Sequence, residues 1–117
     1  MISQNSPAER RLFDVQVWVL ARGPSTWLAD LHPYEPCRVA GVVERLLIDP
    51  RAGLITAWLS DGTATVPAQW GIWRRTPVLA LMPGCAIVLE GVAFVGQDDK
   101  LVLGEPAFEK HAFSEAA

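Results

Sequence analysis

The sequence has few of the side chains from which catalytic and metal sites are built. It contains two Cys and two His in 117 residues, and no set of three or four ligands has the spacing of a metal site. His32 and His111 lie near opposite ends of the chain. Neither a glycine-rich phosphate loop nor a Ser-His-Asp order is recognisable. We therefore expect a protein that is not an enzyme and that needs no cofactor or metal.

The scarcity of cysteine also excludes a disulfide framework. Cys37 and Cys85 each begin a predicted strand, so buried free thiols are the ordinary interpretation. A single bridge between the two strand starts stays open as the alternative, provided that the compartment is oxidising.

Long apolar runs and an excess of positive charge are missing too. No run approaches the roughly 18 residues that would span a membrane, and the polar segment Met1–Pro7 has no apolar core of the signal-peptide type. We therefore expect a cytoplasmic protein.

The net charge is −3 and the sequence pI is about 5.3, which argues against a strongly basic nucleic-acid binder. The ten basic residues are mostly Arg, and Arg suits both phosphate contacts and stacking.

Hydrophobic residues are abundant: they make up 50% of the chain, against 20% charged residues, as expected for one folded domain. Alternating or continuous apolar runs between turn residues predict five strands. These are 38–48, 54–59, 63–70, 85–95 and 100–103, the last continuing over 107–111 after an interruption at Glu105-Pro106. Asp61-Gly62 predicts a two-residue hairpin turn. Gly41 and Gly91 mark sharp bends, and Pro67 marks an edge or a bulge.

The segments outside these strands are predicted from capping and turn residues. Ser6 and Pro7 favour a short helix that ends near Phe13, and the alternation that follows favours a strand over 13–20. One helical turn is expected within 25–31, and 32–36 is a rigid connector. A helix within 72–82, capped by Thr76 before Pro77, would plug the barrel with Leu79–Met82. Residues 1–35 thus form a partly ordered extension, 36–111 the domain and 112–117 a flexible tail.

Three segments of the predicted domain resemble the OB-fold nucleic-acid-binding family. Val39-Ala40-Gly41-Val42-Val43 is similar to the first strand of that family, Trp58–Val66 to its second and third strands, and Pro83–Gly91 to its fourth. Small stand-alone actinobacterial members are among the similar proteins. The resemblance covers about residues 36–110 and departs from the common pattern at Ala64, where many members have Gly. It implies an all-β fold, a five-stranded Greek-key OB-fold barrel with a short helix between strands three and four.

The resemblance further implies a ligand that crosses strands two and three between two flanking loops. In that register Trp58 would stack on a base, and cations would neutralise phosphates of single-stranded or structured DNA or RNA. The candidate nucleic-acid-binding residues are Arg45, Arg51, Thr56, Trp58, Thr63, Thr65, Arg74, Arg75 and Lys100. Asp49, Asp98 and Asp99 border the same loops and would repel phosphate. The ordinary alternative is that Trp58 packs under the N-terminal segment and the cations are solvated.

A protein-interaction adaptor, or a subunit of an assembly, is the second functional interpretation. Trp70 and Trp73 lie close to Arg74 and Arg75, and Trp and Arg are enriched in binding hot spots. The ordinary alternative is that the two tryptophans close the bottom of a small core.

Overall fold

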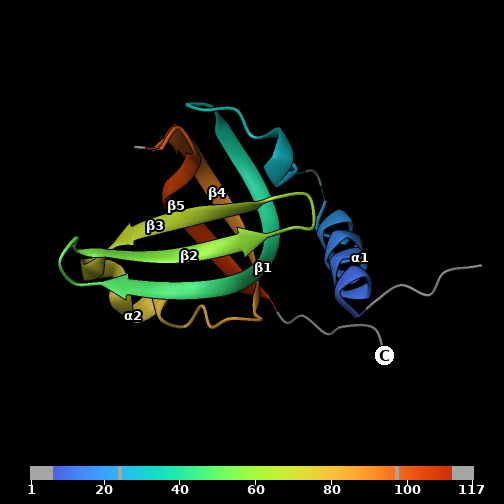
Figure 1. Ribbon diagram of the computed structural model, residues 1–117, viewed down its shortest axis with the longest axis horizontal. Helices are drawn as coiled ribbons and strands as arrows, with labels where there is room; N and C mark the ends of the chain where they lie inside the picture. The colour runs from blue at the N-terminus through green and yellow to red at the C-terminus, as the bar shows by residue number, and fades with distance from the viewer. Residues whose placement is uncertain (1–6, 24, 97, 112–117) are drawn as a thin grey trace, which may run out of the picture.

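Five β-strands form one closed sheet in the computed structural model, which describes residues 7–23, 25–96 and 98–111. The strands are β1 (Pro36–Asp49), β2 (Leu54–Ser60), β3 (Thr65–Gly71), β4 (Ala86–Val95) and β5 (Leu101–His111). They follow each other around the barrel in the order β1-β2-β3-β5-β4 (Figure 1). Only the β3–β5 pair is parallel. The predicted set of five strands and the mainly β class are confirmed.

The long strand β1 serves two neighbours, which lets the sheet curl into a ring. Its first half, Pro36–Val42, pairs with β4, and its second half, Val42–Asp49, pairs with β2. Gly41 lies where the strand changes partner. A Cβ at Gly41 would lie 2.5 Å from the carbonyl oxygen of Ser60, so the predicted bend depends on the missing side chain.

A β-bulge in β1 then changes which residues face outward. The register with β2 shifts between Val43 and Arg45. Val43 is in the core, Glu44 and Arg45 are both exposed, and Leu46 packs against the core again. Strict alternation would have turned Arg45 inward with Val43. The bulge therefore delivers Arg45 to the outer surface.

The N-terminal segment differs from its prediction. Residues 13–20 are not a strand, because α1 (Pro7–Ala21) is one continuous helix. Val15 and Val19 lie four residues apart on its buried face, where they pack against the outer side of β1 and β4. The proposed Ser6 cap lies outside the described residues. The expected helical turn is confirmed as η1 (Leu28–Asp30).

The interior of the ring is apolar, and one of its ends is closed by the segment between β3 and β4. Ile55, Ala57 and Leu59 of β2 all face inward, as predicted. The closing segment contains η2 (Ile72–Arg74) and α2 (Arg75–Val78). The predicted plug is partly wrong, because Val78 and Leu81 are the buried residues.

The remaining parts of that plug prediction also differ from the structure. Leu79 and Met82 are exposed, and α2 already begins at Arg75, one residue before the predicted cap at Thr76. The side chains of Arg75 and Thr76 lie outside the described part of the structure. None of the described helices is long and apolar enough to cross a membrane.

The two cysteines lie at different levels of the barrel, which excludes the bridge. Cys37 is opposite Gly91, whereas the carbonyl of Cys85 accepts a hydrogen bond from the N–H of Val43, six residues further along β1. Both thiols are free and half-buried. Burial raises the pKa of each thiol; a smaller opposing effect comes from the positive charge of Lys110 near Cys85.

Candidate nucleic-acid interface

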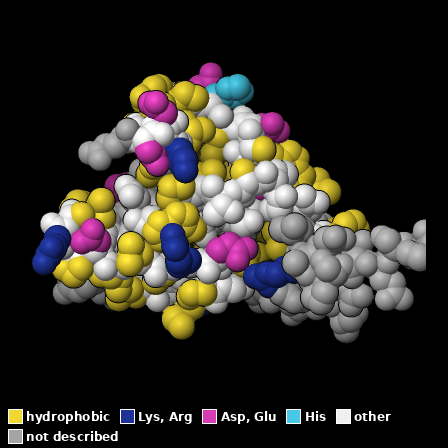
Figure 2. All heavy atoms as spheres, in the orientation of Figure 1, with side chains coloured by type: hydrophobic (Ala, Val, Ile, Leu, Met, Phe, Trp, Pro, Cys, Tyr) yellow, Lys and Arg dark blue, Asp and Glu magenta, His cyan; other side chains and the backbone are white. Residues whose placement is uncertain are grey.

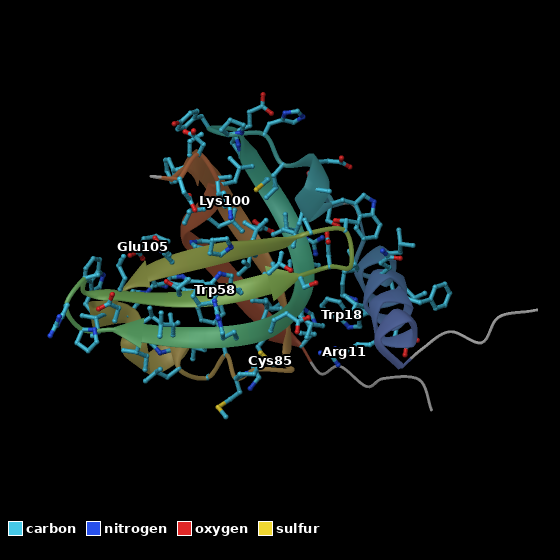
Figure 3. All side chains as sticks on the ribbon, viewed as in Figure 1. Arg11, Trp18, Trp58, Cys85, Lys100 and Glu105 are labelled. Atoms are coloured by element: carbon cyan, nitrogen blue, oxygen red, sulfur yellow. The ribbon has the colours of Figure 1, made fainter. Side chains whose placement is uncertain are left out.

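The centre of the candidate interface is a stack of Arg45 on Trp58. Trp58 points outward from β2, as predicted, and is half-buried. Arg45 is its partner across the β1–β2 pair, and its guanidinium carbon lies 4.0 Å from the centroid of the Trp58 ring. Figure 3 places Trp58 on the open face formed by β1, β2 and β3. Because Arg45 is exposed, the stack presents a charged group backed by an aromatic ring.

Polar side chains next to the stack are hydrogen-bonded to each other and do not present a row of free hydroxyls. Thr56 lies on the outer face, as predicted, but it is only 7% exposed. Its hydroxyl accepts a hydrogen bond of 3.3 Å from Nε2 of Gln69, its partner on β3. The structure therefore joins Gln69 to the predicted site. The alternation along β3 is regular, with Val66, Ala68 and Trp70 buried, so the outward direction of Gln69 was available from the sequence although the residue was not named.

The connection between β2 and β3 is longer than predicted, and this moves Thr63 out of the sheet. β3 begins at Thr65 and the loop spans residues 61–64, so the expected two-residue turn and the strand start at Thr63 are wrong. The cause is the buried carboxylate of Asp61, which accepts hydrogen bonds from the N–H groups of Leu28 (2.7 Å) and Thr63 (2.9 Å). An Asp that caps its own loop in this way stabilises a wider turn.

The two remaining threonines differ: Thr63 lies in the loop, whereas Thr65 stays on the outer face of β3, two residues from Pro67, the partner of Trp58. The hydroxyl of Thr63 donates to Asp61 and accepts a hydrogen bond of 3.2 Å from the N–H of Ala29. It is therefore already used to hold η1. Thr65 is exposed opposite Ser60, at the first position of β3.

The candidate cations lie in separate loops around this face. Arg51 is exposed in the loop between β1 and β2, and Lys100 is exposed in the loop before β5. Arg74 belongs to η2, where its Nη1 lies 3.9 Å from Oε2 of Glu105. Asp49 does not act only as a repelling charge, since its Oδ1 accepts the N–H groups of Arg51 (3.1 Å) and residue 52 (3.2 Å).

The two tryptophans of the adaptor hypothesis have different environments. Trp70 is fully buried, and its indole N–H donates a hydrogen bond of 2.9 Å to the carbonyl of Pro106. It is a core residue, so the prediction that it forms part of a binding surface is wrong. Trp73 is 74% exposed, and its ring lies against the position where Gly71 lacks a side chain.

His111, one of the two histidines, lies at the end of β5, against the N-terminal helix. The described residues contain no group of three or more His, Cys, Asp or Glu that could hold a metal ion. Nε2 of His111 lies 3.3 Å from Oε1 of Glu109, and its ring packs edge-on against Trp18 of α1, with the ring centroids 5.8 Å apart. His111 thus anchors the helix to the end of β5.

Comparisons with known proteins identify the fold and no family. No protein-family model matches the chain, and no curated protein matches it either. Among solved structures, "OBody AM3L09 bound to hen egg-white lysozyme" aligns with a TM-score of 0.65 at 18% identity, over 79% of this chain and 99% of that one. OBody AM3L15, also bound to lysozyme, aligns with a TM-score of 0.62 at 20% identity, over 81% and 96%.

A natural assembly is also similar. A chain of the S. pombe Stn1-ten1 complex aligns with a TM-score of 0.58 at 14% identity, over 68% of this chain and 60% of that chain. At such identities the likeness concerns the fold, which is OB-like.

Proposed function

We propose that this chain is a non-enzymatic protein that binds single-stranded or structured DNA or RNA on the outer face of β1, β2 and β3. The observation that carries the proposal is the exposed Arg45–Trp58 stack on this face. Recognition of unpaired nucleic acid depends on planar groups that stack on bases and on cations that approach phosphates. The stack supplies both in one place.

In the proposed mode a base stacks on the outer side of the Arg45 guanidinium, and Trp58 supports that group from below. Arg guanidinium planes stack on bases as aromatic rings do, and a stacked base contributes about 1–3 kcal/mol. Trp58 limits the motion of the guanidinium, so less conformational entropy is lost on binding. In this mode the backbone of the ligand runs beside the stack, over the hydrogen-bonded side chains of Thr56 and Gln69.

Phosphate contacts then come from the surrounding cations. Arg51 is the favoured one, since it is exposed in the loop between β1 and β2. Lys100 adjoins Asp98 and Asp99, and Arg74 adjoins Glu105, so both are partly neutralised. With a net charge of −3, the binding is expected to be weak, or to take place within a larger assembly.

Fluorescence anisotropy with a labelled oligothymidylate tests the proposal at low salt. We expect saturable binding that Arg45→Ala or Trp58→Ala weakens about tenfold, because the loss of one stacked base costs about 1.4 kcal/mol or more. Arg45→Lys keeps the charge but not the plane, and should weaken binding almost as much. Trp73→Ala is the matched control and should bind normally. Equal affinities for all four variants, at unchanged thermal midpoints, would rule out the stack as the binding site.

The adaptor remains a second candidate function because of Trp73. A tryptophan that is 74% exposed is a typical hot-spot residue, and the OBody structures pair a similar barrel with a protein, lysozyme. If this surface binds a partner, Trp73→Ala abolishes complex formation in a pull-down. The variant should keep the thermal midpoint of the wild type. A complex that survives the substitution would exclude Trp73 as the contact.

A further inference from the structure

A second exposed surface lies at the far end of β4, away from the Arg45–Trp58 stack. Tyr34, just before β1, and Phe94 of β4 pack edge to face with ring centroids 6.0 Å apart. They remain 64% and 46% exposed, and the neighbouring Val95 is 42% exposed. We call Tyr34, Phe94 and Val95 the aromatic patch. Large apolar side chains that gather on a surface commonly mark an interaction site.

The backbone holds the aromatic patch in place. Tyr34 has a φ of 67°, which is uncommon for a residue with a bulky side chain. Its N–H donates a hydrogen bond of 2.8 Å to the carbonyl of Ala93, which fixes it beside β4. Phe94 lies over Gly104, where a Cβ would come within 2.7 Å of the ring. Both rings are therefore positioned by specific contacts and yet stay open to solvent.

Acidic side chains border the aromatic patch. Glu35 follows Tyr34 directly, and Asp98 and Asp99 lie in the loop that follows Val95; all three are exposed. Lys100 is the one basic residue of that loop, over 96–100. In Figure 2 hydrophobic atoms gather at the top of the molecule, with magenta acidic groups along their border. Three exposed carboxylates against one lysine leave an excess of negative charge beside the patch, which favours cationic groups.

We propose that the aromatic patch and its acidic border form a docking surface for a basic protein segment. The partner places an apolar or aromatic side chain against Tyr34 and Phe94, and its Lys or Arg side chains lie beside Asp98 and Asp99. The apolar contact supplies most of the affinity, and the charges select the partner and speed its approach. A nucleic acid is disfavoured by the three carboxylates. A second copy of this chain is disfavoured because two acidic borders would meet.

The aromatic patch is distinct from the Arg45–Trp58 stack, although the loop that borders the patch also carries Lys100, one of the proposed phosphate contacts. The Arg45–Trp58 stack lies on β1 and β2, whereas the aromatic patch belongs to the end of β4 and the segment before β1. The two proposals therefore rest on different central residues and are tested by different variants, Phe94→Ala for the patch and Arg45→Ala for the stack.

Selection of peptides from a random phage-displayed library on the immobilised full chain tests the proposal. We expect enriched peptides that combine Lys or Arg with Leu, Phe or Trp. Synthesised versions should bind the wild type and lose at least tenfold in affinity on Phe94→Ala. They should lose a similar factor on the charge reversal Asp98→Lys with Asp99→Lys, and they should bind more weakly as salt is added. Met82→Ala removes an exposed apolar side chain elsewhere and serves as the matched control.

Several outcomes would overturn the proposal. These are a library that enriches nothing, peptides without cations, and peptides whose affinity does not depend on Phe94 or on the two aspartates. Weaker oligothymidylate binding by Phe94→Ala would assign the patch to nucleic acid, and a dimer that Phe94→Ala dissociates would assign it to a second copy. Tyr34→Asn serves as a second variant if Phe94→Ala does not fold, because Asn tolerates a positive φ.

Discussion

At the scale of single residues, the candidate interface depends on the side of the sheet to which Arg45 points, because only an outward Arg45 stacks on Trp58. The outward direction of Trp58 follows from the alternation along residues 54–59, and it was predictable. The stacking of Arg45 was not, because a bulge between Val43 and Arg45 reverses the alternation of β1. The one signal in the sequence is the charged pair Glu44-Arg45 between the apolar segments Val39–Val43 and Leu46–Ile48.

Asp61 provides a stability test at the same scale. Asp61→Ala leaves the N–H groups of Leu28 and Thr63 without their buried acceptor, so we expect the free energy of unfolding to fall by about 1–3 kcal/mol. Urea unfolding measures the change. Asp49→Ala removes an exposed carboxylate that caps a loop, and should cost less than about 1 kcal/mol. Equal costs for the two substitutions would show that Asp61 is no more important than a surface cap.

The raised pKa values of Cys37 and Cys85 give a pH dependence. Well below pH 9.0, the ordinary thiol value, both thiols are protonated in the folded and unfolded states, and they contribute no pH dependence to the free energy of unfolding. Above it the unfolded thiols ionise first, so the folded state binds more protons and stability falls as the pH rises. Urea midpoints of the wild type should therefore decrease more steeply above pH 9.0 than those of a Cys37→Ala, Cys85→Ala double variant. Parallel pH profiles would contradict this.

At the scale of elements, α1 shows why a short apolar pattern is ambiguous. Phe13, Val15, Val17 and Val19 alternate as in a strand, yet Val15 and Val19 also share one face of a helix. A strand would place all four on one face, whereas the helix buries Val15 and Val19 and exposes Phe13 and Val17; both structures bury Val15 and Val19, so those two residues do not choose between them. The helix is stabilised by tertiary packing, because Val15 and Val19 cover an apolar surface on the outer side of β1 and β4, far away in the sequence.

Two valines of α1 test this packing. Val19 is buried against β1 and β4, so Val19→Ala should lower the free energy of unfolding by about 1–3 kcal/mol. Val17 is exposed, and Val17→Ala should change it by less than about 0.5 kcal/mol. Chemical denaturation followed by circular dichroism measures both. A neutral Val19→Ala would mean that α1 adds little to the stability of the barrel.

The points at which the strands begin and end depend in part on side-chain hydrogen bonds, which strand propensity does not take into account. The predicted limits of β2 are nearly those observed, because turn residues bound it on both sides. The start of β3 was missed because Asp61 widens the loop. β5 continues through Glu105, which adopts a φ of 49° while its Oε1 accepts a hydrogen bond of 2.6 Å from the N–H of Gly71. The predicted interruption is therefore a local distortion within one strand.

At the scale of the whole molecule, the ring is closed by the parallel pair of β3 and β5. This contact joins segments that are more than thirty residues apart, and no local pattern encodes it. The five strands were predicted from their own sequences, whereas their order around the barrel came from the resemblance to the OB-fold family. The similar solved structures support that fold.

The small number of basic residues around the stack sets how strongly salt should weaken nucleic-acid binding. Arg51, Arg74 and Lys100 are the basic residues around the stack that are proposed to meet phosphates. Each neutralised phosphate of a single strand contributes about −0.7 to the slope of log K against log salt. We therefore expect a slope of about −2 for oligothymidylate, measured by anisotropy at several salt concentrations. A slope near zero would exclude phosphate contacts, and a much steeper one would require cations outside this face.

The most direct test of the Arg45–Trp58 stack is a titration of isotope-labelled protein with oligothymidylate, followed by the five indole N–H resonances in nuclear magnetic resonance spectra. Trp58 lies under Arg45, Trp70 is buried and Trp73 is exposed elsewhere, so the indole signals separate the sites. We predict that the Trp58 signal shifts progressively and saturates while the Trp73 signal stays in place. A spectrum in which Trp58 does not move, or in which only Trp73 moves, would contradict nucleic-acid binding at the stack.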